Sequence, residues 1–431
     1  MLAVRATERA DLSNRRYRAL LRALFWVALA LRLTFVVFFH SPRDFVYSDM
    51  QSYHTVALEL LTGVQSPWHA FRPVGYSMLL AILYVLSDAS GTWVGVVQGA
   101  MGAALVPLTA ALARSAGASR KTALVSALAV AFSLPLIFYG GLLLTEVPTS
   151  FFMMLGLVLA VTRRPCERRP VWKRLALSGL SLGIAAALRP NLLVVCPVLI
   201  GFLLLREPSG LRFARPWRGA LLLLLALAVP VLLVSAYNSR VLGHLAGPAK
   251  NGGLNFYLNF ADVLTVQYQG PFGGYWVSPI PNGFHYTRYE LSAVPFFEER
   301  HYYAAGLKYV REHPRALVLA LRNFVEAAGL GNQIYWPNWP GHEVLFRGYA
   351  LAFFGAVLAP ALCSLIGLVW GRVRARVRPQ ALLIAALCVA SALPMYLFLG
   401  DPRVRVPFDP LWIVLSGLAY QAALRVLRFR R

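Results

Sequence analysis

The sequence has 431 residues, of which 58% are hydrophobic and only 14% are charged. Its apolar residues come in runs close to the roughly 20 residues that cross about 30 Å of hydrocarbon, a pattern that a soluble core does not need. The formal net charge of +24 would fit a nucleic-acid-binding protein, but the basic residues are confined to particular segments between the apolar runs. We therefore set aside nucleic acid as a partner and predict an integral membrane protein.

Six basic segments set the predicted topology. Together they hold 27 Lys/Arg and only 4 Asp/Glu, whereas the rest of the chain holds 15 and 14. They are residues 1–22, 114–121, 163–174, 206–218, 372–378 and 425–431. Because basic residues collect on the cytosolic side of a membrane, we expect these segments and both termini to be cytosolic.

Ten apolar runs predict an all-α polytopic fold with about ten transmembrane helices in one membrane-embedded domain, residues 1–431. The runs cover residues 23–40, 92–113, 122–140, 146–162, 175–188, 192–205, 219–238, 346–370, 381–399 and 408–424. A further apolar stretch, residues 75–86, is short for a span, and if it crossed, the basic segments after it would lie outside. We therefore expect two structured external loops, at about 41–91 and 239–345. Within the second, charged and apolar residues alternate at helical spacing over 299–330, as in helices that lie on a membrane surface.

The first external loop carries a candidate acid and a candidate cation. Asp49 follows the first span closely, where a carboxylate is well placed to act as a general base or a metal ligand; a solvated loop acid is the alternative. Arg72 and Tyr76 flank a Pro-x-Gly turn at the start of the short apolar stretch. A guanidinium suits bidentate phosphate recognition, although interfacial anchoring would place the same residues there.

Polar residues also occupy two short turns between apolar runs. Glu146 lies in the turn at 141–146, and Arg189 and Asn191 lie in the turn at 189–191. Both turns are expected on the external side. Their side chains either line one cavity with Asp49 or are solvated turn residues, and the sequence leaves both possibilities open.

Two further segments are candidates for ligand contacts. Arg403 and Arg405 lie on the otherwise nearly neutral outer side, directly before a predicted helix. The partial positive charge of a helix N-terminus would add to theirs and favour a phosphate, unless the arginines simply reach to lipid headgroups. The segment from Asn251 to Asn255 combines glycines, amides and an aromatic neighbour, which suits hydroxyl-rich ligands, although Asn-Gly is also a common turn. Arg32, inside the first span, is expected to have a structural partner.

The ordered series of these motifs resembles the GT-C membrane glycosyltransferases, in particular the superfamily of protein O-mannosyltransferases and the bacterial lipid A aminoarabinose transferase. The resemblance runs through nearly the whole chain. The matching pieces are Asp49-x-x-x-Tyr53, Arg72-Pro-x-Gly-Tyr76, Thr145-Glu146, Gly183 to Arg189-Pro190, Asn251-Gly-Gly with Asn255, His313-Pro314 and Arg403-x-Arg405-x-Pro407.

The resemblance implies an inverting transfer of a sugar from a polyprenyl-phosphate carrier to an envelope lipid, glycan or protein, on the external face of a bacterial inner membrane. It gives the base role to Asp49. The developing phosphate charge needs fixed cations, for which Arg72, Arg403 and Arg405 are the candidates. Further substrate contacts are expected from Tyr53, Tyr76, Glu146, Arg189, Asn191, Asn251 and Asn255.

One departure from the family concerns metal binding. Relatives often have a second acid directly after the first, whereas here Met50 follows Asp49. The sequence therefore predicts no cofactor with certainty and leaves a divalent metal ion open.

Two rival functions fit a membrane protein of this composition. A transporter or flippase of a lipid-linked sugar would show repeated halves and polar gaps near the midplane of its spans, whereas the polar groups here cluster at one face. A non-catalytic envelope-assembly subunit would tend to lack the external acid or the arginine pair, and both are present.

Overall fold

The computed structural model describes residues 2–46, 48–162, 171–205, 216–261, 265–268, 275–276, 289–292, 294–331, 343–369, 377–398 and 400–429. Parts of the basic segments at 163–174, 206–218 and 372–378, and of the loop predicted at 239–345, lie outside these residues. All the candidate site residues lie within them.

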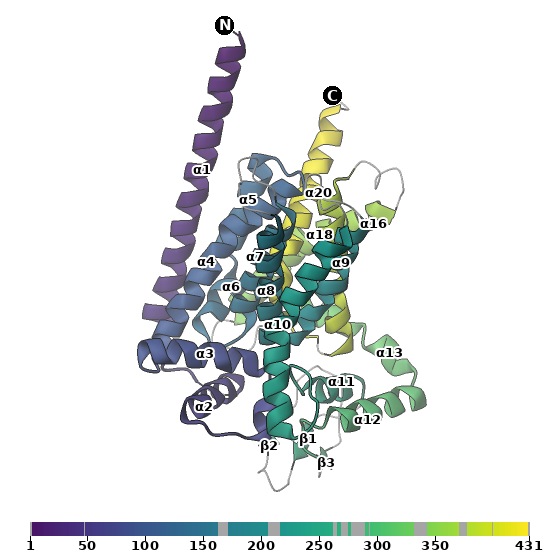
Figure 1. Ribbon diagram of the computed structural model, residues 1–431. Helices are drawn as coiled ribbons and strands as arrows, with labels where there is room; N and C mark the ends of the chain where they lie inside the picture. The colour runs from purple at the N-terminus through teal and green to yellow at the C-terminus, as the bar shows by residue number, and fades with distance from the viewer. Residues whose placement is uncertain are drawn as a thin grey trace.

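Apolar helices that run roughly side by side make up most of the described chain (Figure 1). Each of the ten predicted spans is helical. The segments are α1 with η1 (Leu2–Thr34, Phe35–Phe39), α4 (Gly91–Ser115), α5 with α6 and η3 (Arg120–Ala131, Leu134–Phe138, Tyr139–Gly141), α7 (Glu146–Val161), α8 (Val171–Leu188), η4 with α9 (Pro190–Val194, Val195–Leu205), α10 (Pro216–Leu242), α15 with η5 and α16 (Glu343–Phe353, Phe354–Leu358, Ala359–Val369), α18 (Pro379–Leu397), and α19 with η6 and α20 (Pro402–Arg405, Val406–Phe408, Asp409–Phe429).

Within the described residues, seven of these segments are long and apolar enough to cross a membrane by themselves. An eighth, α5 followed by α6 and η3, is bent by 51° where Pro135 opens α6, because proline cannot continue the preceding hydrogen-bond ladder. The helices α7 and η4–α9 are shorter apolar segments. The chain is thus a multi-pass, predominantly helical membrane protein, as predicted.

The two termini lie at one end of the bundle, which indicates an even number of crossings (Figure 1). At the opposite end lie elements from both predicted external loops. They are α2 (Asp49–Thr62), η2 (Pro67–Ala70), α3 (Val74–Ser87), α11 (Gly252–Phe260), α12 (Glu299–Glu312), α13 (Arg315–Leu319) and α14 (Arg322–Ala327). The helix α3 covers the short apolar stretch and runs across the direction of the bundle instead of along it (Figure 1).

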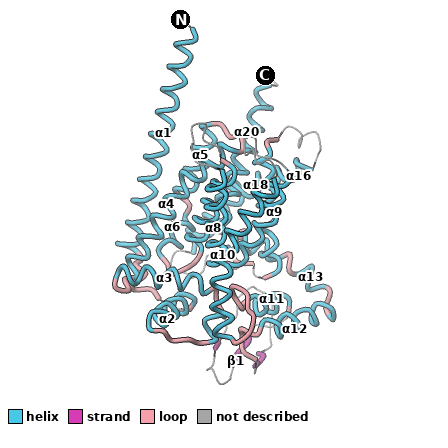
Figure 2. The backbone as a smooth tube through the Cα atoms, in the orientation of Figure 1, coloured by secondary structure: helices cyan, strands magenta, loops and turns pink. Residues whose placement is uncertain are grey.

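A small sheet, which the sequence did not predict, lies in the second of these loops. Its strands are β1 (Thr265–Tyr268), β2 (Tyr275–Trp276) and β3 (Tyr289–Ser292), in the order β2-β1-β3. β1 pairs antiparallel with β2, with Gln267 opposite Trp276, and parallel with β3, with Thr265 opposite Tyr289. Figure 2 shows these strands at the end of the molecule away from the termini.

Two kinds of contact hold the bundle helices at close range. A Cβ on Gly179 or Gly183 of α8 would lie 2.3 Å from a backbone oxygen of α10, so these glycines let the two helices touch, as small residues four apart do in membranes. The fully buried Arg32 donates to the carbonyl oxygens of Ala28, Val130 and Ala131 at 3.0 Å. Arg32 therefore has the structural partners that the sequence predicted.

Candidate functional site

Asp49, the first residue of α2, is held by two arginines from distant parts of the chain. Its Oδ1 lies 2.7 Å from Arg72 Nη1, and its Oδ2 accepts from Arg403 Nη1 at 3.0 Å. The Asp49 side chain keeps 20% of its exposure. It is thus neither a freely solvated loop acid nor a fully buried one.

Glu146, the first residue of α7, is bound by the same Arg403 and by Arg189. Its Oε1 accepts from Arg403 Nε at 2.8 Å and lies 3.1 Å from Arg189 Nη1. The Glu146 side chain is fully buried, which rules out a solvated turn residue. Its other oxygen, Oε2, is buried and has no hydrogen-bond partner among the described residues.

These contacts unite four chain segments into one cluster, which we call the Arg403 cluster: Asp49, Arg72, Glu146, Arg189 and Arg403. The structure thereby brings together the acid of the first predicted loop and residues of the three turns around it. Within these five residues, three guanidinium groups face two carboxylates. The arginine side chains are only 14–17% exposed, and at such partly desolvated positions charges interact more strongly than in bulk water.

The ends of the helices position the cluster. Arg189 is the residue between α8 and Pro190, which opens η4. Arg403 lies in the first turn of α19, where the side chain of Asp401 accepts from the Arg403 backbone N–H at 2.8 Å. Aspartate followed by proline is a common helix start, because the carboxylate caps a free N–H and proline needs none.

The electrostatic environment separates the acids at this site. Burial by itself raises the pKa of Asp49, but the charges of Arg72 and Arg403 outweigh it and hold this pKa below its ordinary value. Burial raises the pKa of Asp401 to about 6, against the opposing charge of Arg403. At neutral pH Asp49 is therefore a tightly held carboxylate, and Asp401 is poised close to its titration.

Tyr53 and Tyr76 support the cluster from the side of α2 and α3. The rings meet edge to face with centroids 4.9 Å apart, and burial raises the pKa of Tyr53 to about 12, so its phenol stays protonated. The fully buried Tyr76 donates to Gln98 Oε1 at 2.8 Å. The Gln98 amide in turn donates to the carbonyl oxygens of Gly140 and Leu142, which steadies the segment that leads to Glu146.

The asparagines of the predicted site lie at different places. Asn191 follows Arg189 closely, and its Oδ1 is buried without a hydrogen-bond partner among the described residues. Asn251 directly precedes α11, and Asn255 lies within it. Their segment reaches the Arg72 side of the cluster because the Lys250 backbone N–H donates to the carbonyl of Ala70 at 2.9 Å. No contact of the Asn251 or Asn255 side chain with the Arg403 cluster is seen in the described residues.

Arg405 does not join the cluster, contrary to the expectation that it pairs with Arg403 on a phosphate. It is buried, donates from Nε to Asp409 Oδ1 at 2.8 Å and from Nη1 to the Ala327 carbonyl at 2.7 Å, and lies over the Phe353 ring. Residues two apart on a helix point in different directions. Arg405 is therefore placed as a structural residue, and Arg189 takes the position expected for it.

The cluster does not fit a divalent metal ion in this arrangement. The described residues contain no group of three His, Cys, Asp or Glu side chains that would hold one. Both oxygens of Asp49 and one of Glu146 are engaged by guanidinium groups, whose positive charge opposes a second cation.

Two residues of the site were missed in the sequence. Asp401 directly precedes a proline at a helix start, which is a capping signature. Gln98 is a lone amide within an apolar run, and polar groups inside spans usually have a partner. Both signals can be recognised in the sequence, but neither identifies the distant segment that the side chain contacts.

Comparison with known proteins relates the fold to a known architecture. Over 97% of its length the chain matches the archaeal oligosaccharyltransferase AglB from Archaeoglobus fulgidus, solved in complex with an inhibitory peptide and a dolichol-phosphate, with a TM-score of 0.53 and 13% identity. The chain has the GT-C fold. Residues 80–236 also match the family of dolichyl-phosphate-mannose-protein mannosyltransferases. The resemblance to the GT-C superfamily predicted from the motifs is thus confirmed.

The structural matches cover nearly all of this chain but only about half of each oligosaccharyltransferase chain. A second structure of the Archaeoglobus fulgidus oligosaccharyltransferase, tethered to an acceptor peptide, matches 96% of this chain at 13% identity with a TM-score of 0.49. The chain described here spans about half the length of these two oligosaccharyltransferase chains, 50% and 51%. No curated protein matches it in sequence.

Proposed function

We propose that the chain is an inverting glycosyltransferase that moves a sugar from a polyprenyl-phosphate carrier to a hydroxyl of an envelope lipid, glycan or protein. The observation that carries this proposal is the bridge from Asp49, the first residue of α2, through Arg403 to Glu146, the first residue of α7. The match of residues 80–236 to dolichyl-phosphate-mannose-protein mannosyltransferases supports a lipid-phosphate donor. So does the shared fold with an oligosaccharyltransferase that was solved with dolichol-phosphate.

The arginines of the cluster are the proposed phosphate ligands. When the bond between the sugar C1 and the phosphate oxygen breaks, its electron pair stays on the phosphate, and negative charge grows there. Fixed cations in a partly desolvated site stabilise such charge without reorganisation, and guanidinium groups match phosphate oxygens in pairs. We assign this role to Arg72, Arg189 and Arg403.

Asp49 is the proposed general base. The acceptor oxygen forms the new bond to the sugar C1, and its proton passes to the Asp49 carboxylate. With both oxygens engaged by Arg72 and Arg403, and with its pKa below the ordinary value, Asp49 is a weak base. A donor phosphate competes for the same arginines, loosens their hold and lets the pKa of Asp49 rise, so the donor is expected to bind before the acceptor is activated.

Two buried acceptor oxygens, one on Glu146 of the cluster and one on Asn191 near Arg189 in the chain, suit a substrate with many hydroxyl groups. Glu146 Oε2 and Asn191 Oδ1 are buried without a hydrogen-bond partner among the described residues. An unpaired buried oxygen costs free energy that a hydroxyl donor would recover. We assign them to hydroxyl groups of the sugar or the acceptor, and we assign Asn251 and Asn255 to the sugar or the carrier. Tyr53 and Tyr76 then act on substrate only through the packing of α2 and α3.

The proposed location is the inner membrane of a bacterium, with the cluster on the external face and both termini in the cytosol. Two observations support it. The basic segments that include both termini would be cytosolic by the positive-inside tendency. The helix α2, which begins at Asp49, lies at the opposite end of the molecule from the termini (Figure 1). The single domain of residues 1–431 is part of the same proposal.

The experiment is the release of polyprenyl phosphate from a panel of labelled polyprenyl-phosphate sugars by the reconstituted full chain, with envelope extract as acceptor. Wild type is compared with Asp49→Asn, which keeps the shape of the side chain but removes the base. Glu312→Gln is the matched control, because Glu312 is an exposed acid of α12 at the same end of the molecule. We expect release by wild type and the control and its loss in Asp49→Asn.

Each other result selects a rival function. Donor that crosses the bilayer uncleaved would identify a transporter. Absence of release with every donor, by a folded wild-type chain, would favour a non-catalytic assembly subunit. Equal release by wild type and Asp49→Asn would keep the enzyme class but remove the base role from Asp49.

A further inference from the structure

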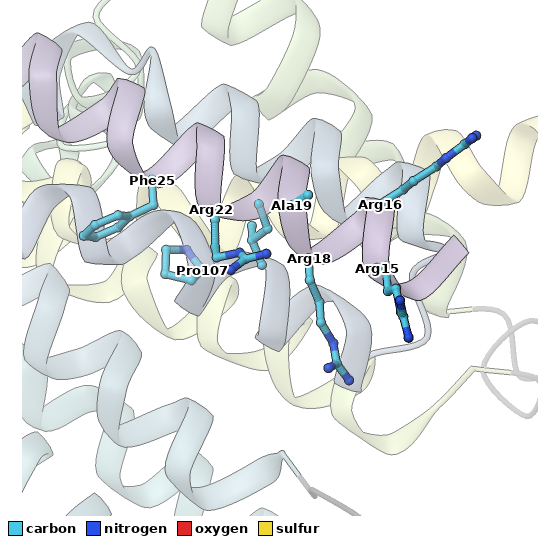
Figure 3. A pocket seen from close by; sticks show the side chains of 8 residues that line it. Arg15, Arg16, Arg18, Ala19, Arg22, Phe25 and Pro107 are labelled. Carbon is cyan, nitrogen blue, oxygen red and sulfur yellow. The ribbon is translucent and has the colours of Figure 1, made fainter. Parts of the chain in front are cut away.

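A basic cavity lies far from the Arg403 cluster, toward the end of the bundle that holds the termini. It has a volume of about 830 Å³ and is formed by α1 together with Pro107 of α4. Its lining combines basic and apolar side chains: Arg15, Arg16, Arg18, Ala19, Leu21, Arg22 and Phe25 of α1, and Pro107. Figure 3 shows Arg15 and Arg18 pointing to the same side of α1 and Arg22 over Pro107.

The spacing of these residues explains the shape of the cavity. Arg15, Arg18, Arg22 and Phe25 are three, four and three residues apart, so they form one stripe along α1. The stripe changes from charged to apolar in the direction of the membrane span. With a rise of about 1.5 Å per residue, its three arginines cover roughly 10 Å of the helix axis, comparable to the depth of a headgroup region. A ligand that fits it has an anionic head and an apolar tail.

The surroundings of the stripe suit a membrane boundary. Only 17% of the apolar window of α1 is buried inside the protein, so most of this helix faces lipid. Trp26, one turn beyond Arg22, is 63% exposed, and tryptophan is typical of the membrane interface. Two arginines of neighbouring helices add positive charge: Arg114 in the last turn of α4 and Arg120 at the start of α5. Both lie near enough to act electrostatically on Tyr17 of α1.

We propose that this cavity binds an anionic phospholipid of the leaflet on the side of the termini, with its phosphate among Arg15, Arg18 and Arg22 and an acyl chain along Phe25 and Pro107. Basic pockets between transmembrane helices suit such headgroups. The site is separate from the proposed catalytic one, and the lipid is a bound partner and not a substrate.

The test measures phosphatidylglycerol bound to the detergent-solubilised full chain by native mass spectrometry, in competition with phosphatidylcholine. The variant carries Arg15→Gln, Arg18→Gln and Arg22→Gln. A basic residue near a membrane surface contributes roughly 1 kcal/mol, which is about fivefold in affinity. With three arginines removed, we expect phosphatidylglycerol binding to weaken on the order of 100-fold.

The matched control removes the same number of charges elsewhere. It carries Lys173→Gln, Arg218→Gln and Arg425→Gln, which are exposed residues of α8, α10 and α20 outside the cavity lining. The control is expected to bind phosphatidylglycerol like wild type. Equal weakening in both variants would overturn the proposal in favour of diffuse attraction. Equal binding of the two lipids by wild type would overturn it as well.

Two further measurements use only the wild-type chain. The first locates the bound lipid, and the second distinguishes a lipid from a soluble phosphate. A phosphatidylglycerol with a photoreactive headgroup is expected to label the wild-type chain within residues 15–25 or at Pro107 and its neighbours in α4, and labelling confined to other helices would contradict the site. Glycerol phosphate, which carries the headgroup without acyl chains, is expected not to displace the lipid at equal concentration. Full displacement would show a site for soluble phosphates instead.

Discussion

Arg403 donates from Nε to Oε1 of Glu146 at 2.8 Å, at a glutamate that is fully buried. The other side of the same guanidinium reaches Asp49. A planar, forked cation can serve two carboxylates at once in a fixed geometry, which a compact ammonium group cannot. Arg403 therefore sets the distance and orientation between the proposed base and the second acid.

Replacing Arg403 by lysine is expected to keep the charge and lose the bridge. Removing one fixed donor to a developing anion typically costs about 10²–10³ in rate, so polyprenyl-phosphate release should fall by that order. Arg311→Lys, at an exposed position of α12, is the control and should leave the rate unchanged. Wild-type release by Arg403→Lys would mean that charge alone, and not the bridge, is what the site requires.

Asp401 is expected to make the stability of the protein depend on pH. Its pKa is raised from 3.8 to about 6, so the stability it contributes is full below pH 4 and is lost as the pH rises through about 6. The difference corresponds to roughly 3 kcal/mol. Asp401→Asn keeps an acceptor for the Arg403 N–H and has no proton to lose. Melting temperatures from pH 4 to 7 should fall in wild type and much less in this variant; parallel curves would show that Asp401 does not titrate there.

Arg405 is expected to matter for folding and not for phosphate binding. It and Asp409 form a buried ion pair, and removing one partner of such a pair costs about 3–5 kcal/mol, whereas replacing both with apolar groups is often neutral. Arg405→Met should lower the melting temperature strongly, and Arg405→Met combined with Asp409→Leu should recover most of the loss. The folded double variant should release polyprenyl phosphate at the wild-type rate. Inactivity of a stable double variant would return Arg405 to the site.

Gly183 is expected to be essential for the contact between α8 and α10. A Cβ there would lie 2.3 Å from the Leu227 carbonyl oxygen and 2.9 Å from Pro230 Cδ, so Gly183→Ala must push the helices apart, at a cost of about 1–3 kcal/mol. Gly201→Ala is the control, because nothing lies within 4 Å of its Cβ position. In thermal unfolding in detergent, Gly183→Ala should have a lower melting temperature than Gly201→Ala. Similar melting temperatures would indicate that α10 moves away from α8 at little cost.

The sequence alone predicted the elements whose causes are local. An apolar run of about 20 residues must form its backbone hydrogen bonds internally wherever it crosses lipid, so the ten helical segments, the short α3 and the position of Asp49 near the end of the first span could be read directly. The bend before α6 was not among them, because the apolar run at 122–140 predicted a single span. Residues of the small sheet, such as Thr265 and Tyr289, pair across a loop, and no local pattern specified that pairing.

What the sequence determined about the site was the set of polar residues at one face of a membrane protein: Asp49, Arg72, Glu146 and Arg189 were all named from it. Only the tertiary structure decided which of them meet. Arg403 and Arg405 are two residues apart with the same side chain, yet Arg403 joins Asp49 and Glu146 while Arg405 is buried against Asp409. The reason is that the partner of a charged group near a helix end depends on how that helix is rotated against its neighbours, and this rotation is set by packing over the whole bundle.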